Sequence, residues 1–312
     1  MTVKSRLARA QASAGTLRGQ SSVLGQPTDG NYARDMISDP NRIADVIASG
    51  VTSSLPGFIF PETLAPSGVA VYTQSTAEDL KVEGIGDRAE HGEYPMVRFT
   101  PGDLKEARTG DIGGKFRVSD EALAAGDGSL LNDGMALLAT SIRRVLNQML
   151  VEALDLITQP DGPGQSLATG NSWRNFTLTG QTPTPELERP WADIIAARRL
   201  LSNNGLAANA DAVLVDETSV DALSVIHGPG KVSEEWGMAV YSSPELPDAN
   251  AFVISSTGFG NLVTKNGLQV ETWRDPSIRA TWVQAFIEPT IVIHRPANVV
   301  RIVGIDGIQA GG

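Results

Sequence analysis

The strongest constraint on the fold is one long amphipathic segment, at about residues 129–158. Its apolar side chains recur at spacings of three, four and seven residues, which places them on one face of a helix: Leu131, Leu138, Ile142, Val145, Met149 and Leu156. Such a helix is roughly 45 Å long, and it ends before Pro160, which cannot continue it. A helix of this length needs partners along its whole apolar face. It therefore predicts a structural spine.

The last stretch of the chain, residues 279–303, has the period of two expected of strands. Thr281, Val283, Ala285 and Ile287 alternate with larger or polar residues, and the pattern continues past Pro289. After a break at Arg295-Pro296, a third short strand is expected. This module contains no candidate nucleophile, metal cluster or phosphate loop. It is typical of a protein that holds a shape rather than one that turns over a substrate.

Two segments of the first third are predicted to extend away from the body. Residues 1–65 are rich in Ser, Gly, Thr and Pro, with one expected helix at 40–48, and cannot bury enough apolar area to fold alone. Residues 66–118 hold strand-like pieces at 69–73, 94–100 and 114–119 around a charged, Gly-containing middle. This arrangement favours a long two-stranded ribbon, and because isolated ribbons are marginal in water, we expect it to lie on another surface.

The second half of the chain reads as an α/β unit. A helix is predicted at 191–203, with Ile194, Ile195, Leu200 and Leu201 facing inward. Residues 210–227 read as strand, turn and helix, with Ala212 to Val215 buried. Strand pairs are expected at 240–254 and 262–273.

Composition excludes several classes of protein. The chain has 312 residues, 41% of them hydrophobic, and no cysteine, which rules out disulfides and thiolate sites. It has no signal-peptide pattern and no apolar run near the roughly 18 residues of a bilayer span, so no membrane association is expected. A net charge of −11 argues against tight nucleic-acid binding by the whole surface. The first segment alone is purely basic and is read as a solvated arm or as a contact for an acidic partner or packaged DNA: Lys4, Arg6, Arg9 and Arg18.

Candidate acids and histidines do not form a recognisable catalytic or metal-binding pattern. Asp216-Glu217 follows a buried strand, where α/β enzymes place acids, but helix capping is favoured; the same holds for Asp120-Glu121. The three histidines are scattered and give no metal-ligand spacing: His91, His227 and His294. No metal and no cofactor are expected.

The remaining motifs are equally weak. Two GxG pairs, Gly84/Gly86 and Gly258/Gly260, do not continue into a dinucleotide fingerprint. Residues 162–166 lack the Lys of a P-loop. The tryptophans are spread through the sequence and are read as core or interface anchors: Trp173, Trp191, Trp236, Trp273 and Trp282.

In this order, the parts resemble the major capsid proteins of tailed double-stranded DNA bacteriophages, which have the HK97-type fold. The matching stretches are 114–123 leading into the long helix, 210–223, 239–254, 266–273 and 279–303. The resemblance covers roughly residues 65–305. The Ser-Pro-x-Leu-Pro turn at 243–247, the Arg-Pro-Ala-x-Val ending at 295–299 and their spacing are its most specific features.

The resemblance implies an α+β HK97-type fold in four parts: an N-terminal arm (1–65), an extended E-loop (66–118), a peripheral domain with the spine helix (119–184 and 285–312) and an axial α/β domain (185–284). The closing strands are expected to complete the peripheral sheet. It implies a structural protein, not an enzyme, that assembles in the host cytoplasm as hexamers and pentamers. The product is the icosahedral head enclosing double-stranded DNA, located in the virion.

The implied partners are further copies of the chain, a separate scaffolding protein, a portal protein, a decoration protein and packaged DNA contacted non-specifically. Some members of the family form a Lys–Asn crosslink between subunits. Lys81 and Lys105 lie in the expected E-loop and Asn298 near the end, but solvated lysines are the favoured reading. Two alternatives stay open: an encapsulin-type cargo shell with the same fold, and, more remotely, an α/β enzyme using Asp216 and a histidine.

Overall fold

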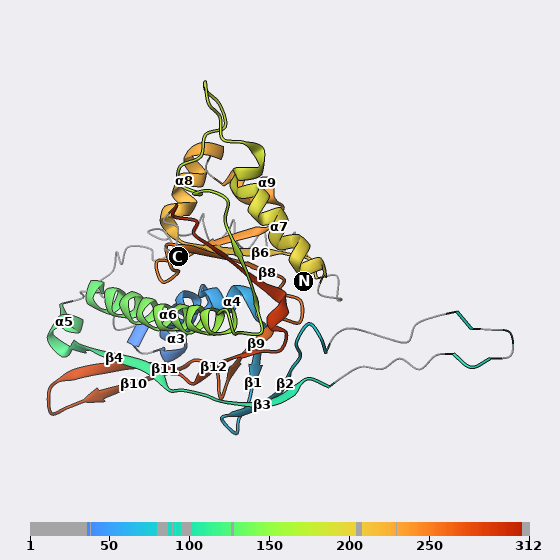
Figure 1. The fold of residues 1–312 in the computed structure, drawn as a ribbon. Coiled ribbons are helices and arrows are strands. Elements are labelled where there is room, and N and C mark those ends of the chain that lie inside the picture. The colour runs from blue at the N-terminus through green and yellow to red at the C-terminus, as the bar shows by residue number, and fades with distance from the viewer. Residues whose placement is uncertain are drawn as a thin grey trace.

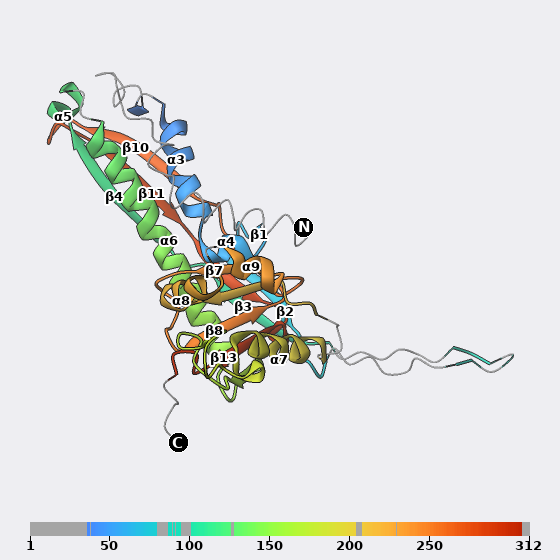
Figure 2. The same cartoon turned by 90° about the horizontal axis from the view of Figure 1, so that it is seen from above.

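The computed structural model describes residues 36–37, 39–79, 87–88, 90, 92–94, 101–125, 128–203, 208–228 and 230–307. In this part of the chain, a long layer of helices and strands carries a compact α/β unit that rises from one end of it (Figures 1 and 2). Several predicted positions lie outside the described residues: Lys4, Arg6, Arg9, Arg18, Lys81, Gly84, Gly86 and His91.

The predicted spine is confirmed as helix α6, Ser129–Ile157. Its first half packs on helix α3 (Pro40–Thr52), which confirms and lengthens the helix expected at 40–48. The predicted apolar face is only partly right, because Val145 and Leu156 are 38% and 66% exposed. The buried stripe runs instead through residues that the spacing rule left out: Met135, Leu146, Leu150 and Leu154. The helix meets different partners at its two ends, so its buried face shifts around the axis.

A three-stranded antiparallel sheet lies along the first half of α6. Its strands are β10 (Gln269–Asp275), β11 (Ala280–Ile287) and β4 (Ile112–Ser119), with β11 in the centre. Val283 and Ala285 of β11 are fully buried against α6 and α3, which follows from the period-two pattern. The short helix α5 (Asp120–Ala124) follows β4.

The ribbon prediction needs one correction. Strand β2 (Val69–Gln74) does form a two-stranded antiparallel ribbon, but its partner is β3 (Asp103–Arg108). Residues 114–119, which the sequence pattern placed in the ribbon, belong to β4 and pair with β11 in the body. The alternating Phe116 and Val118 have an apolar layer to enter only there. Of the middle piece, 94–100, residues 95–100 lie outside the described chain.

The α/β unit is built on a five-stranded sheet in the order β5-β13-β8-β6-β7. The strands are β5 (Gln165–Ala168), β13 (Val299–Val303), β8 (Asn250–Ile254), β6 (Ala212–Val215) and β7 (Ala239–Ser242). Helices α7 (Pro190–Asn203), α8 (Glu217–His227) and α9 (Lys231–Trp236) cover one face, which confirms the predicted α/β unit. In α7, Ile194 and Leu201 are buried and Ile195 and Leu200 half-buried.

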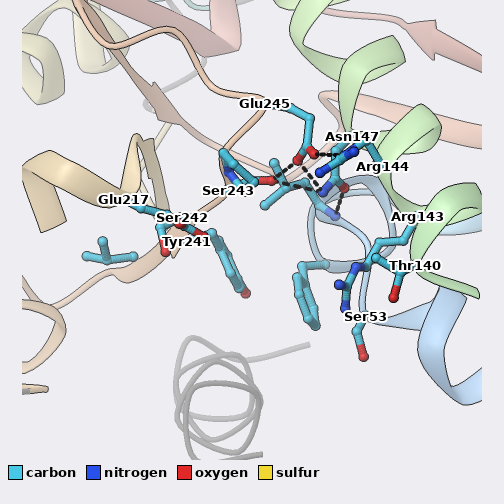
Figure 3. Close-up of a pocket in the computed structure, with 14 residues that line it drawn as sticks. Ser53, Thr140, Arg143, Arg144, Asn147, Glu217, Tyr241, Ser242, Ser243 and Glu245 are labelled. Carbon is cyan, nitrogen blue, oxygen red and sulfur yellow. Dashed lines mark hydrogen bonds and ion pairs between the residues drawn. The ribbon is translucent and has the colours of Figure 1, made fainter. Parts of the chain in front are cut away.

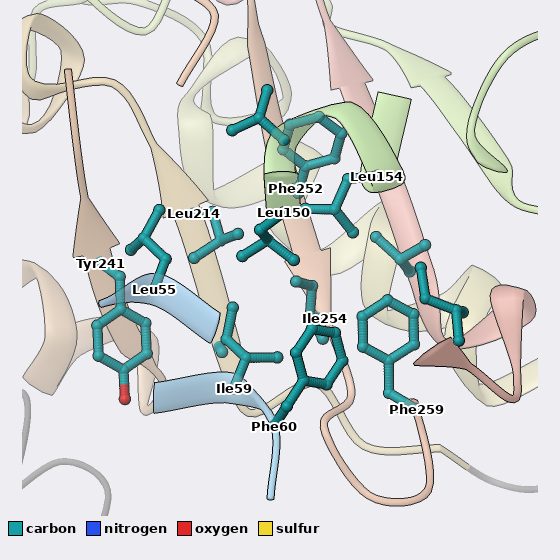
Figure 4. Packing of buried hydrophobic residues seen from close by; sticks show 14 of the residues in the cluster. Leu55, Ile59, Phe60, Leu150, Leu154, Leu214, Tyr241, Phe252, Ile254 and Phe259 are labelled. Atoms are coloured by element: carbon teal, nitrogen blue, oxygen red, sulfur yellow. The ribbon is translucent and has the colours of Figure 1, made fainter. Parts of the chain in front are cut away.

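The other face of this sheet packs on the second half of α6 and on helix α4 (Leu55–Ile59). Figure 4 shows Leu55 and Ile59 beside Leu150 and Leu154, with Phe252 of the sheet above them. Covered on both faces, β6 is apolar at every position, and β8 and β13 are apolar except at Asn250 and Arg301. Helix α6 thus contributes to two hydrophobic cores, one shared with α3 and the three-stranded sheet and one shared with α4 and the five-stranded sheet. It joins the two halves of the molecule.

The expectation that all three closing strands complete one peripheral sheet is wrong for the last two of them. Strand β11 does lie beside α6, but β13 pairs with β5 and β8 in the five-stranded sheet. Strand β12 (Pro289–Ile293) forms a third sheet with β9 (Gly260–Thr264) and β1 (Glu62–Leu64). A 3-10 turn at Pro296–Asn298 redirects the chain between β12 and β13. Val299, Val300 and Ile302 are completely buried, which requires a strand covered on both faces.

Candidate assembly surfaces

The acids after strand β6 have a structural role. Asp216 caps helix α8, because its Oδ2 accepts from the Ser219 N–H at 2.9 Å. The same oxygen accepts from Arg174 Nη2 at 3.0 Å, and the carboxylate is buried. The favoured interpretation of Asp216 as a helix cap is therefore confirmed by its contacts. Glu217, the next residue, points outward and is exposed.

The second acidic pair supports the edge of the three-stranded sheet. Asp120 contacts Arg274 Nη2 at 2.6 Å, and Glu121 lies 3.4 Å from Arg279 Nη1. The hydrogen bond from Arg274 lowers the pKa of the Asp120 carboxyl below its ordinary value. Asp120 and Glu121 also occupy the first turn of α5, capped by Ser119. The contact between Asp120 and Arg274 links the end of β4 to β10 across the central strand β11.

The two described histidines lie in different parts of the molecule. His227 Nδ1 lies 2.6 Å from Glu235 Oε2 beside helix α9, whereas His294 contacts Tyr72 and the Thr73 carbonyl at the root of the ribbon. Asp216 contacts neither of them. Within the described residues, no group of His, Asp or Glu has the arrangement of a metal site. None of the described helices has the length and apolar character to cross a membrane.

The glycine motifs form turns. Gly258 has φ +67°, a conformation that favours glycine, in the turn that leads from β8 to β9. Gly162 and Gly164 pass close to the Ile157 carbonyl, where an added Cβ would lie 2.4 and 2.6 Å from that oxygen. Both sites let the backbone turn tightly at an element end.

The tryptophans gather in two clusters that their sequence positions do not reveal. Trp236 contacts Trp173 edge-on and Trp191 face-on, with centroids 5.7 and 6.5 Å apart, in the core under α7 and α9. Trp273 and Trp282 stack at 6.2 Å on the face of the three-stranded sheet that points away from α6. Lys115 Nζ and the Arg117 guanidinium lie 4.9 and 5.7 Å from the Trp282 ring.

The described candidates for a Lys–Asn crosslink have contacts of their own. Lys105 Nζ donates to Gln74 Oε1 within the ribbon. Asn298 is only 2% exposed, and its amide donates to the Thr257 carbonyl at 3.0 Å. Its amide therefore holds the turn before β13.

A polar joint connects the spine to the α/β unit (Figure 3). Asn147 of α6 accepts from the Leu55 N–H at 2.8 Å and donates to Ser243 at 3.0 Å and Glu245 at 3.2 Å. Arg144 Nε reaches Glu245 at 3.1 Å, and Ser243 also donates to this carboxylate. Burial acts to raise the pKa of Glu245, but these hydrogen bonds outweigh it and hold the pKa below its ordinary value. The joint fixes the angle between α6 and the five-stranded sheet.

Large apolar side chains remain exposed on three parts of the described chain. Val71 and Leu104 lie on the outward face of the β2–β3 ribbon, 64% and 74% exposed. Helix α6 exposes Leu130, Leu137 and Leu156, and the α/β unit exposes Leu187 and Val225. Exposed apolar groups that adjoin one another are typical of interaction sites, and Val71 and Leu104 are such neighbours on the ribbon. Sequence patterning missed them because it assigned apolar residues to the core.

Comparisons with known proteins found solved structures of similar fold and a matching family model. The chain resembles a virus-like particle from Pyrococcus furiosus (14% identity, TM-score 0.58, covering 84% of this chain and 98% of that one). It also resembles a phage-related protein from Bordetella bronchiseptica (11%, 0.56, 88% and 98%) and a protein of Mycobacterium phage Bobi (14%, 0.53, 80% and 90%). No curated protein sequence matches significantly.

The structural likenesses establish the fold, which is of the HK97 type, as the sequence predicted. The sequence itself matches a family model described as "Phage capsid protein" over residues 103–302, which is more than half of the chain. This span includes the spine helix α6 and most of the two hydrophobic cores to which α6 contributes. The protein is thus a structural component of a virion shell rather than an enzyme. The chain belongs to the phage capsid protein family.

Proposed function

We propose that copies of this chain assemble as hexamers and pentamers into an icosahedral phage head that encloses double-stranded DNA. The observation that carries the proposal is the spread of exposed apolar side chains over the ribbon, the spine and the α/β unit. A subunit of a closed shell touches several neighbours at once, so it needs several such surfaces. Each contact can be small, because the stability of the assembly belongs to the lattice as a whole.

In the proposed subunit the chain is divided into four parts with different roles. Residues 1–65 act as an arm and 66–118 as an extended loop, while 119–184 and 285–312 form a peripheral part and 185–284 an axial part. Strand pairing supports two adjustments: β4 groups with the peripheral sheet, and β13 with the axial sheet. The two parts share helix α6 through its two cores.

The proposed partners, beyond other copies of the chain, are those of a DNA-filled head. A separate scaffolding protein guides assembly in the host cytoplasm, a portal protein occupies one vertex, and a decoration protein binds the finished shell. DNA contacts are non-specific and involve the basic positions near the N-terminus: Lys4, Arg6, Arg9 and Arg18. The acidic net charge of −11 suits a wall along which DNA slides during packaging.

Negative-stain microscopy and sedimentation of the purified chain test the proposal. Ring-shaped capsomers or regular shells are expected, and a compact monomer at all concentrations would contradict it. Correct shells from this chain expressed alone would refute the need for a separate scaffold. The material inside shells isolated from cells separates the two shell functions, since DNA supports a phage head and a packaged enzyme supports an encapsulin-type compartment.

A further inference from the structure

The α/β unit carries a cavity that opens to solvent and has one aromatic wall. Its volume is approximately 390 Å³, and its apolar wall is formed by Phe176, Leu178, Trp191 and Trp236. Charged and polar side chains line the rest of it: Glu186, Arg189, His227 and Glu235. Trp191 is 36% exposed although it stacks on the buried Trp236. Among the described residues, no side chain fills this cavity. An open aromatic cavity accommodates an apolar side chain from outside.

The same unit exposes an apolar side chain on the other side of helix α8. Val225 is 86% exposed, whereas His227, two residues later, lines the cavity. Two residues correspond to 200° around a helix, so Val225 and His227 point to nearly opposite sides of α8. Because the cavity and Val225 lie on different sides of the unit, Val225 of one copy can enter the cavity of the next in a head-to-tail contact. Contacts of this kind close into rings when the rotation between copies allows it.

Opposite charges lie at equal distances from Val225 and from the cavity. Glu217 lies eight residues before Val225 on α8, and Arg199 lies eight residues after Trp191 on α7. Both charged side chains are exposed, and neither has a partner within the described chain. Eight residues span about 12 Å along each helix. Eight residues also turn each helix by about 80° beyond two full turns. When α8 of one copy crosses α7 of the next in an inclined antiparallel packing, Val225 reaches Trp191 as Glu217 reaches Arg199.

We infer that α8 of one copy docks on α7 of the next copy, with Val225 in the Trp191–Trp236 cavity and Glu217 paired with Arg199. The inference rests on the proposed shell function and specifies one contact by which subunits form a ring. The occupant is a second copy because the apolar and the charged groups are complementary within one and the same chain. The 12 Å spacing fixes the register.

Engineered cysteines test the contact directly, because the chain contains no cysteine of its own. The full chain with Glu217→Cys and Arg199→Cys together is expected to give, on mild oxidation, a ladder of crosslinked oligomers that ends at the ring size. Either single variant is expected to stay uncrosslinked. A double variant that runs only as monomer would overturn the inference. So would dimers from a single variant, since these indicate a symmetric contact instead.

Charge reversal provides an independent readout. Glu217→Arg or Arg199→Glu alone should lower the assembled fraction roughly tenfold, because a ring repeats a weak ion pair at every subunit. The two reversals combined should restore assembly. If the unsubstituted chain assembles and no single reversal affects it, the inference fails while the shell function stands. If the unsubstituted chain forms no rings or shells, both fail.

Discussion

At the scale of single residues, buried polar side chains decide how the two halves of this capsid protein are joined. Asn147 links α6 to α4 and to Ser243, and Glu245 gathers hydrogen bonds from three side chains. Asn298 ties the turn before β13 to the strand end at Ser255 and Thr257. Each of these groups would be costly to bury without its partners.

The joint predicts a pH-dependent effect of Glu245→Gln. At pH 7 the substitution should lower the free energy of unfolding of the unassembled subunit by about 1 kcal/mol. Because the folded pKa of Glu245 is depressed, its stabilisation is present above the ordinary pKa and is lost as the pH falls through the folded value. Thermal unfolding at a series of pH values measures the difference. A gap between variant and parent that stays constant into strong acid would contradict this.

Asn298→Asp removes the amide donor and places a carboxylate in a buried turn. We expect a loss of about 2 kcal/mol in the free energy of unfolding, measured by urea denaturation of the subunit. The matched control is Asn266→Asp, at an exposed position, which should change stability by about 0.5 kcal/mol or less. Equal losses at both positions would show that the contacts of Asn298 are unimportant.

At the scale of elements, helix α6 combines two functions in one amphipathic segment. Its buried stripe enters two cores in succession, and its outward side carries apolar residues that the described chain leaves exposed. The sequence pattern cannot separate the buried residues from the exposed apolar ones, because both sets contain leucine. Leu150 and Leu156 differ only in the face of the helix on which they lie.

Leu150→Ala and Leu156→Ala form a matched pair that tests this distinction. Leu150 is completely buried, so its truncation should cost about 2–5 kcal/mol in the free energy of unfolding. Leu156 is 66% exposed, and its truncation should change subunit stability by about 0.5 kcal/mol or less. Chemical denaturation of both variants measures these losses. Comparable destabilisation at the two positions would mean that α6 is buried on both faces.

At the scale of the whole molecule, the fold keeps large apolar surfaces outside its own cores. The β2–β3 ribbon is anchored at its root, where Gln74 donates to the Ile293 carbonyl and Tyr72 contacts His294, and its other face points outward. Val71 and Leu104 on that face contribute nothing to the described cores. They are available for another subunit.

Val71→Glu combined with Leu104→Glu should therefore leave the subunit folded but reduce shell formation by at least about tenfold, since buried charges at a contact are strongly unfavourable. Circular dichroism reports the fold and light scattering the assembly. Glu106→Gln, on the same face of the ribbon, is the control and should assemble normally. Unchanged assembly of the double variant would exclude this face from subunit contacts.

Elements with strong local patterns can be predicted from the sequence: the spine helix, the α/β unit and strand β11 all follow from periodicity. The sequence also pointed to the capsid family through the order of these parts. The pairing of the strands, in contrast, depends on long-range contacts in the folded chain. Val299–Val303 and Ile112–Ser119 read as strands locally, but their sheets depend on partners more than 40 residues away. The clustering of the tryptophans, the joint at Asn147 and the cavity opposite Val225 arise from the same long-range contacts, which residue spacing does not encode.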